Sequence, residues 1–246
     1  MKILRCANYE EMSDVAARMI EEQIAEKKNS VLGLATGSTP EGMYAALCRD
    51  YKAGKVDFSE VTTVNLDEYC GLPAEHDQSY RYFMNQNLFD HVNVDPARTF
   101  LPNGTAEDPE EECARYEKLV ADLGYADLQI LGVGRNGHIG FNEPAEVLFT
   151  KTHVTALTKD TIRANSRFFA SVNEVPKRAM TMGVGTIMAS RKIIVLASGE
   201  GKRLALSNLL GDAIDSLCPI TLLKLHHDVT LICDEDAWPH RAKSVD

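Results

Sequence analysis

A glycine-rich run over residues 132–144, Gly-Val-Gly-Arg-Asn-Gly-His-Ile-Gly-Phe-Asn-Glu-Pro, holds the side chains best suited to acid/base chemistry. It follows the apolar segment 127–133, which is typical of a buried strand. Open α/β sheets bind their ligands outside the carboxyl ends of such strands. His138 and Glu143 lie five positions apart across an expected turn, and they predict an oriented imidazole–carboxylate pair that moves protons. A purely structural histidine is the alternative interpretation.

The glycines of this run also fit a dinucleotide-binding pattern. Gly132, Gly134 and Gly137 satisfy G-x-G-x-x-G after a strand. A dinucleotide turn must lead directly into a long helix, whereas Asn142 and Pro144 follow within a few residues. We therefore interpret the glycines as room for a ligand to approach the backbone closely.

A second candidate for acid/base work stands at the end of another apolar segment, 61–66, which two adjacent acids follow. Neighbouring side chains at a strand end point to opposite sides, so only one of Asp67 and Glu68 should face a crevice. Asp67 comes directly after the strand and is the preferred candidate. Partial desolvation there would raise the pKa of its carboxyl group, as suits a general base. A helix cap or a solvated loop acid is the alternative.

The segment 34–40, Leu-Ala-Thr-Gly-Ser-Thr-Pro, predicts the start of a helix after a strand, with Thr39 as N-cap and Pro40 at the first helical position. Free amides, the hydroxyl groups of Thr36, Ser38 and Thr39, and the positive end of the helix dipole would suit a phosphate group. An ordinary capped helix would need only Thr39 and Pro40, so both interpretations stay open at this point.

Cations stand at two further places. Arg163 and Arg167 lie in the segment 160–169, and Lys202 follows Ser-Gly-Glu-Gly at a predicted strand-to-helix junction. A guanidinium group can bind a phosphate through two donors and a lysine adds a point charge, which makes Arg167 and then Lys202 candidate phosphate ligands. Either could instead be a solvated surface residue.

Composition restricts the classes of protein. The 246 residues are 44% hydrophobic, and we expect residues 1–246 to form one domain. A net charge of −10 argues against nucleic acid or an anionic membrane surface as partner. No apolar run approaches the ~20 residues that span a bilayer, and the first ten residues turn polar too soon for a signal peptide. The six cysteines show no metal-ligand spacing, so we expect no metal site and a cytoplasmic protein.

The elements that must position these groups alternate along the chain. Strands are predicted over residues 2–5, 31–35, 61–66, 127–133, 152–157, 179–184, 192–197 and 229–233. Helices are predicted over residues 9–28, 41–51, 79–89, 109–123 and 201–210. This alternation favours an α/β fold with a single doubly wound, mostly parallel sheet and helices on both faces. Residues 71–79 and 142–151 are expected to be functional or covering loops.

Five segments together resemble the glucosamine-6-phosphate deaminase family. The matching segments, 34–40, 65–73, 132–144, 164–169 and 199–202, follow the family's order and spacing from about residue 33 to residue 233. The resemblance implies conversion of D-glucosamine 6-phosphate and water to D-fructose 6-phosphate and ammonia, with no metal or redox cofactor. It also implies an amino-sugar phosphate as the small-molecule partner.

The resemblance further assigns roles to residues. His138, with Glu143 and Asn136, would open the sugar ring, and Asp67 would then take the proton from C2 and deliver one to C1. The implied phosphate ligands are Gly37, Ser38, Thr39, Arg167 and Lys202. Several family members have Asp in place of Asn136, so ring opening should depend more heavily on His138 and Glu143.

Regulated family members carry basic residues after the Asn-Glu-Pro loop and a longer carboxyl tail. Here those places show His153 and Thr155, and the chain stops at Asp246, so we expect no activation by N-acetylglucosamine 6-phosphate. The alternatives are 6-phosphogluconolactonase, which lacks the paired motifs 65–69 and 141–144, and a non-catalytic sugar-phosphate-binding domain. The sequence leaves the oligomeric state open, a homo-oligomer included, as well as the choice between glucosamine and galactosamine 6-phosphate.

Overall fold

A parallel sheet forms the centre of the molecule. The computed structural model describes residues 1–158, 162 and 174–239. The seven strands are ordered β1-β10-β9-β6-β2-β3-β5, and all their pairings are parallel. Their bounds are Lys2–Cys6 (β1), Val229–Asp234 (β10), Lys192–Ala197 (β9), Leu128–Gly132 (β6), Val31–Leu34 (β2), Thr62–Asn65 (β3) and Thr99–Phe100 (β5). The predicted mostly parallel, doubly wound α/β architecture is confirmed.

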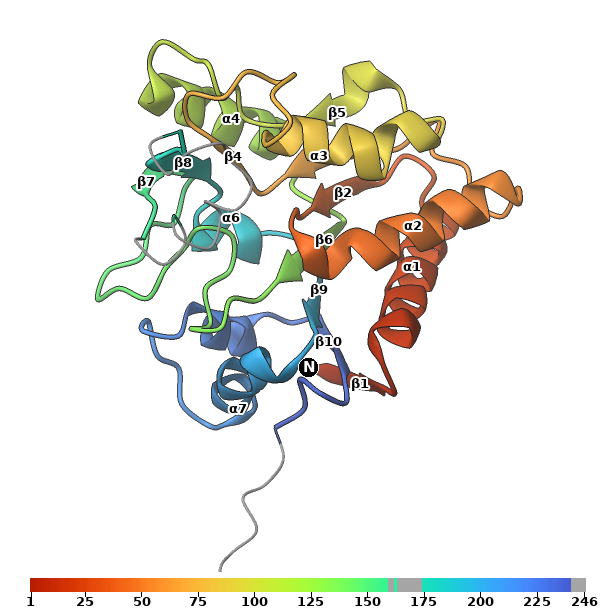
Figure 1. Cartoon of the computed structure of the whole chain (residues 1–246), viewed down its shortest axis with the longest axis vertical. Helices are drawn as coiled ribbons and strands as arrows, with labels where there is room; N and C mark the ends of the chain where they lie inside the picture. Colours follow the sequence, from red (N-terminus) through yellow and green to blue (C-terminus); the bar gives the residue numbers. More distant parts are fainter. Residues whose placement is uncertain (159–161, 163–173, 240–246) are drawn as a thin grey trace, which may run out of the picture.

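Helices cover the sheet on both sides. In Figure 1, α1 (Tyr9–Glu26) and α2 (Ser38–Lys52) lie on one side of β6, β9 and β10, and α6 (Val184–Met188) and α7 (Arg203–Leu210) lie on the other. The remaining helices, α3 (Tyr80–Asn87) and α4 (Pro109–Asp122), lie toward the β3 and β5 edge. None of the helices in the described part of the chain is long and apolar enough to cross a membrane.

Local sequence explains where the helices start. Asn8 caps α1, because its side chain accepts a hydrogen bond from the amide of Glu11 at 2.9 Å. Asp108 caps α4 in the same way, and Pro109 occupies the first helical position, where a missing amide hydrogen costs nothing. Both helices begin within one residue of the predicted bounds.

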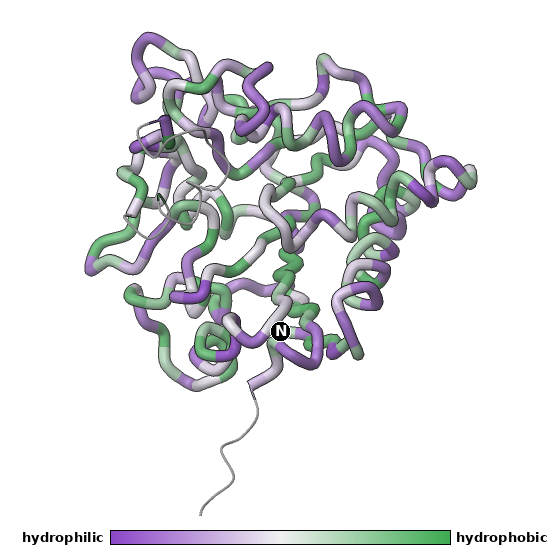
Figure 2. Tube along the Cα trace, in the orientation of Figure 1, coloured by the Kyte–Doolittle hydropathy of each residue, from purple (hydrophilic) through white to green (hydrophobic). Residues whose placement is uncertain are grey.

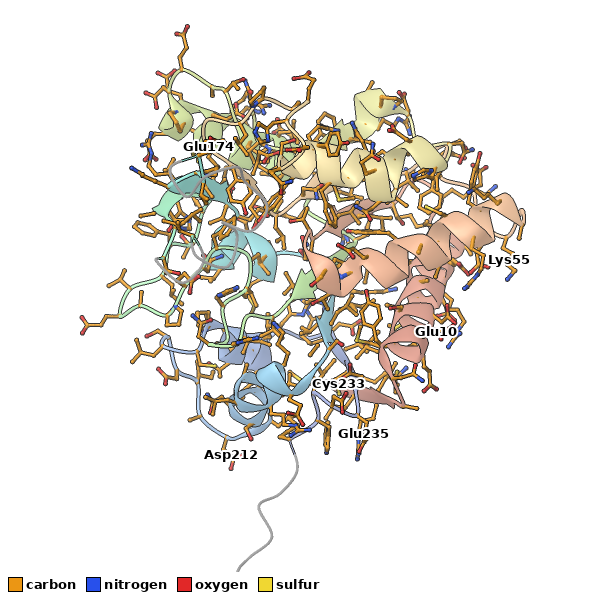
Figure 3. The ribbon with its side chains drawn as sticks, viewed as in Figure 1. Glu10, Lys55, Glu174, Asp212, Cys233 and Glu235 are labelled. Atoms are coloured by element: carbon orange, nitrogen blue, oxygen red, sulfur yellow. The ribbon has the colours of Figure 1, made fainter. Side chains whose placement is uncertain are left out.

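The core consists mainly of aliphatic side chains from the parallel strands. Ile194, Val195 and Leu196 of β9 are at most 1% exposed, and strands with both faces covered require this continuous apolar pattern. Burial of each such side chain contributes about 1.5–3 kcal/mol. In Figure 2 the hydrophobic strand segments, coloured green, lie in the middle of the molecule. Charged side chains such as Glu10, Lys55, Asp212 and Glu235 project from the periphery in Figure 3.

A second, smaller sheet departs from the prediction of one sheet. Strand β4 (Asp67–Tyr69) pairs antiparallel with β8 (Arg178–Thr181), which pairs antiparallel with β7 (His153–Ala156). The segments 152–157 and 179–184 were predicted as strands of the main sheet, but they form this separate one. The chain passes between the sheets at Leu66, whose amide donates to Leu34 O at 3.1 Å and whose carbonyl accepts from the amide of Met182 at 2.7 Å.

Candidate active site

One cavity of about 740 Å³ opens at the carboxyl ends of β2, β3, β6 and β9. The residues after each of these strands contribute to its wall, as expected for an open α/β sheet. Asp67 and His138, which come from different strands, both line it. A methyl group built on Gly140 of the glycine-rich run would lie 3.4 Å from Oδ2 of Asp67, so the run and this acid are in contact.

Asp67 is the first residue of β4 and is 6% exposed. It was predicted to follow the third strand directly, and pairing with Thr181 of β8 makes it the start of a strand in the small sheet. Burial raises the pKa of Asp67 to about 8, and the neighbouring charge of Glu68 adds to the effect. A carboxyl group with this pKa is poised to exchange a proton near neutral pH.

Glu68 points away from the cavity, as the alternation of a strand requires. Its carboxylate accepts hydrogen bonds at 2.9 Å from the amides of Tyr69, Tyr80 and Arg81. Two of these amides belong to the first turn of α3, where orphan amides and the helix dipole favour an acid. Burial still raises the pKa of Glu68, because desolvation outweighs these bonds.

An aromatic wall explains part of the desolvation around Asp67. Tyr80 lines the cavity, and its ring stacks on Phe141 with centroids 6.1 Å apart. Its hydroxyl donates to the hydroxyl of Tyr69 at 3.2 Å. Burial raises the pKa of Tyr80 well above the usual value, so the phenol stays neutral. Tyr80 was not predicted as a site residue, although its place directly after the helix cap Ser79 marks it as the start of α3.

His138, Glu143 and Asn136 form a connected set. Nδ1 of His138 lies 3.2 Å from Oε1 of Glu143. The side-chain amide of Asn136 donates to Oε2 of Glu143 at 2.7 Å, and its oxygen accepts from the backbone amide of His138 at 3.2 Å. The predicted imidazole–carboxylate pair is therefore present, and Asn136 holds both members. Nδ1 is buried against Glu143 without a well-aligned hydrogen bond, so Nε2 is the ring nitrogen that remains for a substrate.

The glycines of the run are needed mainly by the protein itself. A methyl group at Gly134 would lie 2.5 Å from both ring nitrogens of His138, and one at Gly137 would collide with Sγ of Cys218. Gly137 also has φ 87, which other residues rarely adopt. Gly132 and Gly134 line the cavity and Gly132 faces open space, whereas Gly137 packs against Cys218, so the interpretation of the glycines as room for a ligand stays a prediction.

The start of α2 forms another part of the wall, through Thr36, Gly37, Ser38 and Thr39. The helix begins at Ser38, and its N-cap is Gly37 with φ 94 and no side-chain capping bond. The prediction of Thr39 as N-cap and Pro40 as the first helical residue is therefore wrong. A left-handed glycine lets the chain enter the helix earlier, so the first amides have no capping side chain and remain available to an anion.

Lys202 ends the short 3-10 helix η4 (Glu200–Lys202) after β9 and lines the same cavity. Burial and the nearby charge of Arg135 lower the pKa of Lys202. Arg135 also lines the cavity. It was not predicted as a site residue, although a cation inside the glycine-rich run was a usable signal. Arg163 and Arg167 lie outside the described residues. Across the described ranges, no group of three His, Cys, Asp or Glu side chains is placed to hold a metal ion.

Comparisons with known proteins give a consistent result. A family model described as glucosamine-6-phosphate isomerases/6-phosphogluconolactonase matches residues 7–232. Glucosamine-6-phosphate deaminase from Clostridium perfringens (strain 13 / Type A) is 55% identical over 96% of this chain and 98% of its own. The enzyme of that name from Thermoanaerobacter sp. (strain X514) is also 55% identical, over 96% of this chain and 94% of its own.

Solved structures extend the comparison. A structure described as a monomeric glucosamine-6-phosphate deaminase has 48% identity and a TM-score of 0.93, covering 96% of this chain and 98% of that one. The 6-phosphogluconolactonase from Trypanosoma cruzi has 21% identity and a TM-score of 0.77, with 96% and 95% of the two chains covered. At that identity the second comparison shows a shared fold only.

Proposed function

The chain belongs to the family of glucosamine-6-phosphate isomerases and 6-phosphogluconolactonases, and we infer that it converts D-glucosamine 6-phosphate and water to D-fructose 6-phosphate and ammonia. The observation that carries this reaction is the meeting of three features in one cavity. They are a buried acid of raised pKa at Asp67, the His138–Glu143 pair, and the open start of α2 with Lys202 in the same wall.

We propose that the phosphate group of the sugar binds at the start of α2. Gly37, Ser38, Thr39 and Lys202 all line the cavity, and the amides at the start of α2 have no capping side chain. The resemblance adds Arg167, which lies outside the described residues. Binding energy from this unreacting end of the substrate holds the sugar chain against the acid/base groups, which lowers the entropic cost of the reaction.

Ring opening is assigned to His138. The closed sugar must lose a proton from its C1 hydroxyl and gain one at the ring oxygen, and an imidazole can carry out both transfers. Glu143, 3.2 Å from Nδ1, fixes the orientation of the ring and stabilises it when it is charged. Asn136 holds Glu143 in place through its 2.7 Å hydrogen bond.

Deamination follows from Asp67. Ring opening exposes an aldehyde at C1, which acidifies the hydrogen on C2. The carboxylate of Asp67 takes that proton, and the electron pair moves to the aldehyde oxygen, which takes up a proton from water and gives an enolamine. Asp67 then delivers a proton to C1, which leaves a ketimine at C2. Water adds to C2 and ammonia departs, so the product is the ketose phosphate.

An isotope experiment tests the role of Asp67. Parent enzyme in deuterated water should exchange the C2 hydrogen and release ammonia, whereas Asp67→Asn should do neither, because an amide cannot accept the proton. The variant should still bind glucosamine 6-phosphate in calorimetry, since the phosphate contacts lie elsewhere. Asp212→Asn makes the same chemical change at an exposed site and serves as control. Exchange by Asp67→Asn at the parent rate would show that the base is another residue.

The two alternatives make different predictions. A lactonase would hydrolyse 6-phosphogluconolactone without releasing ammonia from an amino sugar, and a sensor domain would bind the sugar phosphate unchanged. The solved lactonase compared above shares only 21% of its residues with this chain, against 55% for the curated deaminases. An ammonia assay over a panel of amino-sugar phosphates separates all three functions and also tests galactosamine 6-phosphate.

We further propose that residues 1–246 act as one domain in the cytoplasm. One main hydrophobic core connects all the strands of the parallel sheet except β5, whose Phe100 packs against it. All six cysteine thiols are free, which supports a reducing compartment. Limited proteolysis that left a stable fragment would argue against a single domain.

A further inference from the structure

Arg135 is a cation that the mechanism above does not use. It lies in the glycine-rich run, one residue before Asn136 and three before His138, and it lines the cavity beside Lys202. A methyl group built on Gly201 would lie 3.1 Å from Nε of Arg135 and 3.5 Å from its Cδ. The Arg135 side chain therefore extends from the loop after β6 to the segment between β9 and α7, where it packs on Gly201.

Arg135 and Lys202 place two positive charges in this wall of the cavity. The positive charge of Arg135 acts, together with burial, to lower the pKa of Lys202. Within the part of the chain that the structure describes, no hydrogen bond or ion pair of Arg135 is found. Two neighbouring cations in one cavity wall repel each other, and a dianion between them would remove that repulsion.

We propose that Arg135 is a further ligand of the substrate phosphate, and that it ties the bound phosphate to the loop that opens the sugar ring. The proposal rests on the function inferred above. A guanidinium group can donate to two phosphate oxygens at once, and a phosphate monoester carries up to two negative charges near neutral pH. Because Arg135 and His138 belong to the same short loop, phosphate binding to Arg135 also fixes the position of the imidazole relative to the sugar ring.

Steady-state kinetics of Arg135→Gln test this role. We expect the KM for glucosamine 6-phosphate to rise about tenfold, equivalent to about 1.4 kcal/mol, with a smaller change in kcat. The dependence of kcat/KM on salt concentration should also weaken, because one charge that attracts the anion is lost. Arg135→Lys keeps the charge and should recover part of the loss. Arg18→Gln on α1 removes the same charge at an exposed site outside the cavity and should match the parent.

Calorimetry with inorganic phosphate separates this proposal from the proposed function. Phosphate should bind Arg135→Gln about tenfold more weakly than it binds the parent or Arg18→Gln, whether or not ammonia is released. Equal phosphate affinities in the parent and Arg135→Gln would overturn the proposal. So would a higher KM with unchanged phosphate affinity, because Arg135 would then act only on the shape of the loop. Absence of ammonia release by the parent would instead count against the deaminase function.

Discussion

Replacement of Asp67 by asparagine should stabilise the folded protein, and the gain should grow with pH. Burial raises the pKa of Asp67 from 3.8 to about 8. Between these values the unfolded chain has released its proton while the folded protein still holds it. The folded state thus binds more protons, so the stability of the parent falls as pH rises through this window. Asparagine is neutral in both states and removes this dependence.

The size of the effect follows from the shift. A difference of about 4 pKa units corresponds to about 6 kcal/mol once the pH is above 8, since each unit is worth about 1.4 kcal/mol. At pH 5 only about one unit of the window has been crossed, which gives about 2 kcal/mol. The stability gained through Asp67→Asn should therefore be about 4 kcal/mol larger at pH 9 than at pH 5. This is an upper limit, because a buried site relaxes around a charge.

Urea unfolding of parent and variant at the two pH values measures the difference. Other titrating groups are common to both proteins and cancel in the comparison, provided that the denaturant slopes agree. The exposed control Asp212→Asn should show no comparable pH dependence. If the advantage of Asp67→Asn is the same at pH 5 and pH 9, the carboxyl group of Asp67 does not hold a proton in the folded protein at neutral pH, and the reasoning fails.

Four other outcomes are expected. His138→Gln should slow ammonia release at least about 100-fold, because proton transfer at the ring oxygen is lost; a normal single-turnover rate would refute its role. Gly134→Ala should cause a similar loss, since a methyl group there would lie 2.5 Å from both imidazole nitrogens, with the unfolding free energy measured to exclude a folding defect. Lys202→Ala should raise KM about tenfold with little change in kcat, and an unchanged KM would contradict its phosphate role. Added N-acetylglucosamine 6-phosphate should leave the rate at subsaturating substrate unchanged, because β7 presents His153, which packs on Phe149 at a centroid distance of 4.6 Å, rather than a permanent cation.

The sequence was sufficient for six strands of the main sheet and for much of the candidate site, whereas the two-residue strand β5 was not predicted. Long apolar runs such as β9 have one stable placement, with both faces covered, so their positions could be predicted to within one or two residues. The opposite orientations of Asp67 and Glu68 follow from strand geometry alone. The His138–Glu143 contact could be predicted because the four residues between them, Gly140 included, leave few ways to fold except a turn.

The remaining features depend on contacts that no local pattern encodes. Strand β4 has three residues and exists only because β8 pairs with it, more than 100 positions later in the chain. The cap of α2 was assigned to Thr39 from residue preference, whereas the left-handed turn at Gly37 moved the helix start. The space above Gly134 is filled by His138, and Arg135 reaches Gly201 across the cavity wall. Such packing becomes visible only in three dimensions.

The single residue Leu66 joins the two sheets through its backbone. Its amide donates to β2, the strand that leads to the proposed phosphate site. Its carbonyl accepts from Met182, directly after β8, the strand that pairs with the proposed base Asp67. The distance between the proposed phosphate site and Asp67 thus depends on how Leu66 links the two sheets. Substitutions in the small sheet would change which carbon of a bound sugar faces Asp67, while the contacts to the phosphate group would stay the same. New isomerases could therefore arise from this fold without loss of phosphate binding.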